Sequence, residues 1–313
     1  MRGTIHAETA IKEGRMLPVH SVYRRTVNLA AGGFLLAVHP EEIPLTPLSV
    51  AVPFDDRAFA GFAGAARRAG GVLLTAEGTV RADGREWQAG PWEGWDPKIR
   101  SRLSGKQLQR LGAETEKFLT EKGREKGGLS DAAVFPEPRE SDDLMTAVLR
   151  ERVREVLGCG FSDPAGLKEI LVSMTGLGPG LTPSGDDFLT GILLIIHTGL
   201  PRILEERGRE LAEGVREASA GTNDISRQYL LCAIRGEYGM GLHELVNACL
   251  TQEESSLACP ENRGNGQPGQ KEKIRRALEK TAAAGHSSGI DTLNGILAGI
   301  RLILEYEPCS PGK

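Results

Sequence analysis

One ten-residue frame occurs twice in this chain. S-G-D-D-F-L-T-G-I-L begins at Ser184 and S-G-I-D-T-L-N-G-I-L begins at Ser288, so both follow S-G-x-D-x-L-x-G-I-L. Each copy runs from small polar residues into an apolar segment, which is typical of a buried helix whose N-terminus opens onto a polar site. Gly191 and Gly295 hold equivalent positions, where they allow two helices to approach closely. The frame predicts that the two helix starts converge on one site; the alternative is an accidental likeness.

The rest of the chain predicts an α+β fold. Residues 1–120 contain short alternating and apolar runs and an Asp-Gly turn signal, which indicate a β-rich N-terminal domain. Residues 121–143 are charged and read as a linker. Residues 144–313 show helical periodicity and carry both copies of the frame. Within them, residues 252–270 are rich in Glu, Ser, Gly, Asn, Gln and Pro and are expected to form a mobile surface loop.

Composition excludes several classes of protein. A net charge of -4 argues against nucleic acid or an acidic membrane surface as the main partner. The longest apolar stretch, residues 188–200, is too short and too interrupted to span a bilayer. The five cysteines form no C-x-x-C pair, and the start of the sequence has no signal-peptide pattern. We therefore expect a cytoplasmic protein with free thiols.

The first copy is preceded by glycines and a Thr182-Pro183 helix start. Thr182 or Ser184 can act as the N-cap, and the amide groups at such a helix end bind phosphate or carboxylate. The candidate anion-binding residues here are Gly178, Gly180, Thr182, Ser184, Gly185 and Asp186. The alternative is a loop that caps a buried helix and binds nothing.

Two carboxylates follow directly, at Asp186 and Asp187. Because carboxylates repel an anion, one of them is expected to orient an amide or ammonium group, to bind a cation that bridges to phosphate, or to act as a base. Asp187 is the catalytic candidate of this block. The alternative is that both simply favour the positive end of the helix.

The second copy and a third helix start supply further candidates. His286 and Asp291 are candidate catalytic groups, because a histidine beside serines at a helix start can serve as a general acid or base. Ser287, Ser288 and Gly289 are candidate ligand-binding residues, and so are Asn223 and Arg227 in the segment G-T-N-D-I-S-R. The alternatives are a histidine that caps its own turn and an arginine that faces solvent.

The string G-L-G-P-G-L-T-P-S-G-D-D-F-L-T-G, from Gly176 to Gly191, and the string G-H-S-S-G-I-D-T-L-N-G-I, from Gly285 to Ile296, resemble the two signature blocks of a bacterial family. That family, long described as a domain of unknown function, includes the AllH-type subunit of oxamate carbamoyltransferase. The resemblance implies a role in anaerobic allantoin breakdown, in a multi-subunit enzyme that converts oxalurate and phosphate to oxamate and carbamoyl phosphate. It also implies other subunits of this enzyme as partners, beside a small carboxylate or phosphate ligand.

One departure concerns the phosphate site. The well-known carbamoyltransferases carry a Ser-Thr-Arg-Thr phosphate loop, and this string is absent here, as are the P-loop, H-E-x-x-H and G-x-S-x-G motifs. Two other functions therefore stay open: a non-catalytic ligand-binding or assembly subunit, and a metal-dependent hydrolase built on Asp186, Asp187 and Asp291. No cofactor is expected, with Mg²⁺ as the alternative that the hydrolase would need.

Overall fold

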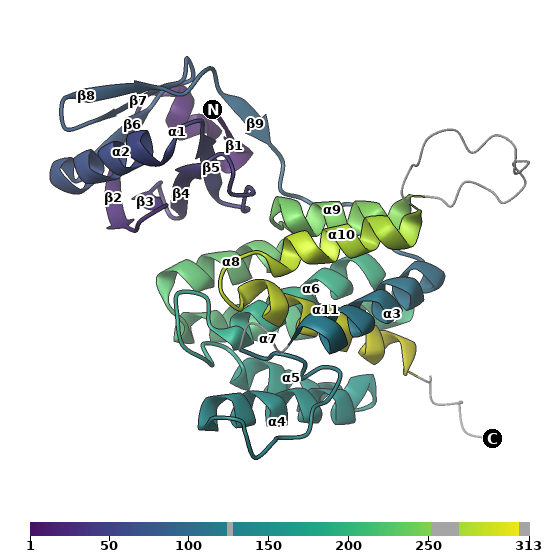
Figure 1. Ribbon diagram of the computed structural model, residues 1–313. Coiled ribbons are helices and arrows are strands. Elements are labelled where there is room, and N and C mark those ends of the chain that lie inside the picture. The colour runs from purple at the N-terminus through teal and green to yellow at the C-terminus, as the bar shows by residue number, and fades with distance from the viewer. Residues whose placement is uncertain (124–127, 252–268, 307–313) are drawn as a thin grey trace, which may run out of the picture. The chain divides into compact units, whose positions relative to one another are not determined.

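The computed structural model describes residues 1–123, 128–251 and 269–306. The chain forms two compact units. The first consists of Met1–Lys98 and Glu237–Met240, and the second of Ile99–Gly236 and Gly241–Lys313. Strands dominate the first unit and helices the second (Figure 1). The predicted α+β class, with a β-rich N-terminal part and a mostly helical C-terminal part, is confirmed.

A single sheet organises the first unit. Its strand order is β8-β7-β6-β2-β3-β4-β5-β1-β9. The strands are β1 (Arg2–Thr4), β2 (Met16–Val22), β3 (Val27–Ala30), β4 (Leu35–Pro40), β5 (Ser49–Val52), β6 (Gly71–Leu74), β7 (Thr79–Ala82), β8 (Arg85–Gln88) and β9 (Glu93–Trp95). The pairs β4–β5 and β1–β9 are parallel and the other pairs are antiparallel. Short α1 (Glu8–Lys12) follows β1.

Helix α2 (Asp56–Ala69) packs on this sheet. Its N-cap Asp55 accepts a hydrogen bond from the Ala58 amide at 2.7 Å. It ends where Gly70 takes the left-handed conformation, with φ of 65°. Phe59 and Phe62 on its buried face belong to the apolar core of the unit. The helix is thus held to the sheet by the burial of aromatic side chains.

The second unit is a bundle built around two helices. Its helices are α3 (Gly105–Lys122), α4 (Leu144–Cys159), α5 (Pro164–Ser173), α6 (Ser184–Gly199), α7 (Glu205–Ala218), α8 (Asp224–Ile234), α9 (Met240–Leu250, whose first residue lies in the first unit), α10 (Gln270–Ala282) and α11 (Ser288–Leu304). Helices α6 and α11 pack along one another, and α3, α8 and α10 surround them (Figure 1). Almost every residue of α11 is buried, so the two copies of the repeated frame form the centre of the bundle.

The boundary between the units differs from the sequence-based one near residue 120. Helix α3 belongs to the second unit, because its Gly112 packs against Ile300 of α11. Residues 121–143, expected as a linker, include buried Leu129 and Ala133. The loop expected over residues 252–270 lies outside the described residues as far as residue 268, and Gln270 already belongs to α10.

The structure also bears on the cysteines and on membrane-spanning segments. Cys159, Cys232 and Cys249 are free thiols. In the described ranges, no helix has both the length and the apolar character needed to cross a bilayer.

Candidate functional site

The two copies of the repeated frame lie against each other at backbone distance. A β-carbon at Gly191 would lie 2.2 Å from the Thr292 carbonyl oxygen, and one at Gly295 would lie 2.0 Å from the Phe188 carbonyl oxygen. Gly191 and Gly295 are equivalent in the frame, and so are Phe188 and Thr292. Each helix therefore meets the other through the same positions. Contacts at both ends of the pair fix its direction: the Thr182 and Ser288 hydroxyls meet at the starts of the two helices, and a β-carbon at Gly299 would lie 3.0 Å from Ile195 Cβ. Helices α6 and α11 therefore run in the same direction, with their N-termini at the same end.

Polar side chains cross between these two N-termini. The Thr182 hydroxyl donates to the Ser288 hydroxyl at 3.4 Å. The Ser288 hydroxyl also lowers the pKa of the Asp187 carboxyl of α6. In return, the Ser184 hydroxyl of α6 lowers the pKa of the Asp291 carboxyl of α11. The two helix starts therefore lie next to each other, as the repeated frame predicted.

The carboxyl groups of Asp187 and Asp291 are buried at this junction. Asp187 is 9% exposed and Asp291 is 0% exposed. Burial raises the pKa of Asp187 well above its usual value, opposed by the Ser288 hydroxyl and reinforced by the charge of Asp291. Burial also raises the pKa of Asp291 to about 6, opposed by the Leu129 amide. Burial thus favours the protonated form of both carboxyls.

Asp186, the neighbour of Asp187, has a different environment. Its Oδ1 accepts a hydrogen bond from the Gly176 amide at 2.7 Å. Its Oδ2 accepts from the Thr222 hydroxyl at 2.5 Å and from the Ser226 hydroxyl at 2.6 Å. The carboxylate thus joins the glycine-rich loop before α6 to the start of α8. All its interactions lie within the protein, so its contribution is to hold these segments in place.

Several amide groups of the two helix starts donate to carbonyls within the protein. The Gly185 amide donates to the Leu177 carbonyl at 2.9 Å, and the Gly289 amide donates to the Ala284 carbonyl at 3.0 Å. The Asp187 amide donates to Pro183 and the Asp291 amide to Ser287. Tight turns before both helices supply these carbonyls, so these donors are used inside the protein and are not available to an anion.

Gly185 and Gly289 have a packing role instead. A β-carbon on either would lie 2.0 Å from a carbonyl oxygen, that of Met174 or that of Thr281. Both carbonyls belong to the end of the preceding helical segment. The second unit therefore repeats one arrangement, in which α5 leads into α6 as α10 leads into α11, and the repeat extends beyond the ten residues visible in the sequence.

The remaining predicted residues lie around this junction or apart from it. Gly178 and Gly180 have φ values of 115° and 103° in the loop before α6, and Gly180 is exposed. Ser287 hydrogen-bonds Asp291. Asn223 caps α8 by accepting from the amides of the residues two and three positions after it, both at 3.1 Å. Arg227 and His286 are exposed, and neither contacts the Asp187–Asp291 pair through a hydrogen bond or ion pair within the described residues.

One contributor to the site was not predicted from the sequence. The segment 128–135, read as part of a linker, lies on α11. The Leu129 amide donates to Asp291 Oδ1 at 2.6 Å, and the Ala133 amide donates to Asn294 Oδ1 at 2.7 Å. Asp131 of this segment forms a buried ion pair with Arg150 of α4 at 2.7 Å. The short run L-S-D-A-A-V-F, apolar within a charged region, was the available signal.

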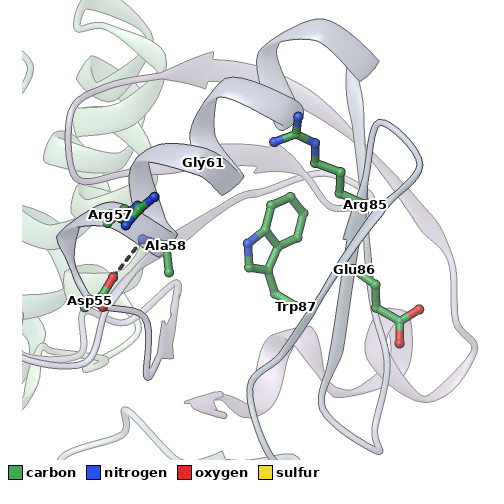
Figure 2. Close-up of a pocket in the computed structure, with 7 residues that line it drawn as sticks. All are labelled: Asp55, Arg57, Ala58, Gly61, Arg85, Glu86 and Trp87. Carbon is green, nitrogen blue, oxygen red and sulfur yellow. Dashed lines mark hydrogen bonds between the residues drawn. The ribbon is translucent and has the colours of Figure 1, made fainter.

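A separate hollow lies in the first unit, between α2 and β8 (Figure 2). It has a volume of about 600 Å³ and is lined by Asp55, Arg57, Ala58, Gly61, Arg85, Glu86 and Trp87. The Trp87 indole packs edge-to-face on Phe62, with ring centroids 5.7 Å apart. None of the predicted site residues lines this hollow, and most of its polar side chains are exposed.

Comparison with known proteins gives one family match, over part of the chain. The family model described as oxamate carbamoyltransferase subunit AllH matches residues 174–263. The resemblance is therefore confirmed over the glycine-rich loop and helices α6, α7, α8 and α9. The second copy of the frame, on α11, lies outside the matched residues. No solved structure matches the chain.

Proposed function

We propose that the chain is a subunit of a carbamoyltransferase similar to oxamate carbamoyltransferase, acting in allantoin breakdown. The enzyme would convert oxalurate and phosphate to oxamate and carbamoyl phosphate. The family match over residues 174–263 supports the reaction class. The observation that supports a direct chemical role is the buried Asp187–Asp291 pair where α6 and α11 begin.

The reaction needs a group that moves one proton. A phosphate oxygen bonds to the carbamoyl carbon, the carbon–nitrogen bond to oxamate breaks, and the released nitrogen takes a proton. A carboxyl that is protonated near neutral pH can give this proton and recover it from the hydroxyl of the attacking hydrogen phosphate. Burial favours the protonated form of Asp187, because it raises the pKa of this carboxyl. In this proposal Asp187 is the general acid, and ionised Asp291 stabilises its protonated form.

The anionic parts of the substrates need positive partners that the pair does not provide. The groups that act on Asp187 and Asp291 are hydroxyls, other carboxyls and the Leu129 amide. Exposed Arg227 and His286 stay candidates for this role, as do cationic side chains of partner subunits. The proposal therefore includes an active site completed by other chains.

A non-catalytic assembly subunit is the second candidate. It is favoured by the polar contacts between the two helix starts, since Ser184–Asp291 and Ser288–Asp187 would stabilise the bundle without any ligand. The metal-dependent hydrolase finds less support. Asp186 accepts hydrogen bonds from three donors, which would compete with a metal ion for its oxygens.

The test is phosphate-dependent oxalurate cleavage by the chain together with its partner subunits. Asp187→Asn should lower kcat by about 100-fold or more, the usual contribution of a general acid, while assembly is retained. Glu169→Gln, which changes an exposed carboxylate on α5, should leave kcat unchanged. Full activity of Asp187→Asn would contradict catalysis by this residue, and cleavage independent of this chain would exclude it from the enzyme.

A further inference from the structure

Strand β8 lies at one edge of the sheet, beside the hollow of the first unit. Among the strands that the structure describes, β8 pairs with β7 alone, so its other edge is unpaired. The hollow between β8 and α2 has a volume of about 600 Å³. A β-carbon at Gly61, in the α2 wall of the hollow, would meet no neighbouring atom within 4 Å. An unpaired edge beside open space is a place where a further strand can add.

The pairing with β7 determines which backbone groups of β8 point to this free edge. Residues 83 and 84 form a two-residue turn with φ values of 53° and 69°, so Arg85 exchanges backbone hydrogen bonds with β7. In an antiparallel pair, such residues alternate with residues whose backbone groups point the other way. The Ala89 amide, four residues after Arg85, donates to the Gly78 carbonyl at 2.7 Å, which fits this alternation. The N–H and C=O of Glu86 therefore point to the free edge.

The side chains of β8 alternate in the same way. Figure 2 shows Arg85 and Trp87 on the side of β8 that faces α2, and Glu86 on the opposite side. Half-buried Trp87 is fixed by its edge-to-face contact with Phe62, with ring centroids 5.7 Å apart. A strand added to β8 would thus direct the side chains opposite Arg85 and Trp87 into the hollow.

The charges that line the hollow indicate what such a strand should carry. Arg57 and Arg85 are exposed and form no hydrogen bond or ion pair with the described part of the chain. The acidic residues of the lining are engaged elsewhere. Asp55 accepts a backbone amide hydrogen of α2 at 2.7 Å, and Glu86 pairs with Arg81 at 2.7 Å. Two arginines therefore remain for a carboxylate from outside.

We propose that β8 and the hollow form a docking site for an extended segment of another protein. The segment adds to β8 as an antiparallel strand and carries an apolar residue followed, two positions later, by Asp or Glu. The apolar side chain lies against Trp87, and the carboxylate lies near Arg85 and Arg57. The residue between them exchanges both backbone hydrogen bonds with Glu86.

Other occupants of this site use less of it. A small anion would leave the free edge of β8 unpaired. Two β8 strands paired with each other would bring further arginines to the hollow and no free carboxylate. The proposal does not rest on the carbamoyltransferase reaction, because β8 and α2 both belong to the first unit.

Fluorescence anisotropy of the labelled peptide Thr-Val-Phe-Lys-Asp-Val-Thr with the full chain tests this inference. In the expected register its phenylalanine lies opposite Trp87 and its aspartate opposite Arg85. Replacing that aspartate by lysine should weaken binding at least about tenfold. Methylating the backbone nitrogen of the peptide lysine should weaken binding about fivefold or more, because one ladder hydrogen bond is lost. Hydrogen exchange of the Glu86 amide should slow when the peptide binds.

Variants of the chain locate the peptide. Arg85→Glu reverses a charge of the hollow and Gly61→Leu fills it, so each should weaken peptide binding at least about tenfold. The matched controls are Arg24→Glu, an exposed arginine, and Gly158→Leu, an exposed helical glycine with open space around it. Both lie outside the hollow and should bind the peptide like the wild type. Circular dichroism should show native helix content in all four variants.

Four results would overturn the docking site. They are no peptide binding up to about 1 mM, equal loss of binding in the hollow and control variants, equal binding of the methylated peptide, and a dimer of the chain alone that Arg85→Glu dissociates. The third would assign the hollow to an anionic group without a strand, and the fourth would assign the edge to a second copy. None of these measurements involves oxalurate, so their outcome and that of the proposed function are separate.

Discussion

At the scale of single residues, two adjacent aspartates have separate roles. Asp186 accepts three hydrogen bonds that join the loop before α6 to α8, whereas Asp187 faces the start of α11. Neighbouring side chains on a helix point about 100° apart, so one can meet α8 and the other α11. The sequence placed both aspartates at the site, but their separate roles depend on which helix packs on which face.

The raised pKa of Asp291 predicts a pH dependence of stability. The folded protein keeps this proton up to about pH 6, whereas the unfolded chain loses it near pH 4. Unfolding therefore releases a proton between these values, and the stability contributed by the protonated carboxyl is lost as pH rises through this window. Above pH 6 the loss amounts to on the order of 3 kcal/mol.

Asp291→Asn removes this titration and keeps an oxygen for the Leu129 amide. Relative to the wild type, its free energy of unfolding should increase between pH 4 and 6.5 and then level off. Urea denaturation at a series of pH values measures the difference. Glu169→Gln should follow the wild type at each pH. Wild-type and Asp291→Asn curves that run parallel across this range would show that Asp291 titrates as an ordinary carboxyl.

At the scale of elements, the close contact of α6 and α11 depends on glycine. Gly295→Ala places a methyl group 2.0 Å from the Phe188 carbonyl oxygen, so the helices must separate. The free energy of unfolding should fall by about 3 kcal/mol, at the upper end for overpacked cores. Gly158→Ala in α4, where nothing lies within 4 Å, should be neutral or stabilise by up to about 1 kcal/mol. Equal effects of the two substitutions in thermal unfolding would contradict the helix contact.

The segment 128–143 is a second structural element with a testable basis. Arg150 is 1% exposed and pairs with Asp131 at 2.7 Å and with Asp142 at 2.9 Å. Arg150→Met removes the buried partner of Asp131 and leaves it only the ion pair with half-buried Arg139; breaking a buried ion pair typically costs about 3–5 kcal/mol. Arg154→Met, which breaks an exposed pair with Glu151, should cost less than about 1 kcal/mol. Urea denaturation compares the two; a small effect of Arg150→Met would mean that the segment is held without this ion pair.

At the scale of the whole molecule, the sequence predicted the α+β class and the meeting of the two repeated helix starts. It could do so because glycine spacing and helix-start residues are local signals. It did not predict the packing of residues 128–143, whose charges suggest a solvated linker. Asp131 and Arg150 lie 19 residues apart in the sequence and form their ion pair only in the folded bundle. It also did not predict that the Gly185 and Gly289 amides donate to carbonyls of the turns before the two helices.

The most direct test of a shared site between the repeated helices is a crystal structure of the chain with oxamate. Oxamate should lie where α6 and α11 begin, with its nitrogen within hydrogen-bond distance of the Asp187 carboxyl. Oxamate found only elsewhere, for example in the hollow lined by Arg57, Arg85 and Trp87, would contradict this account.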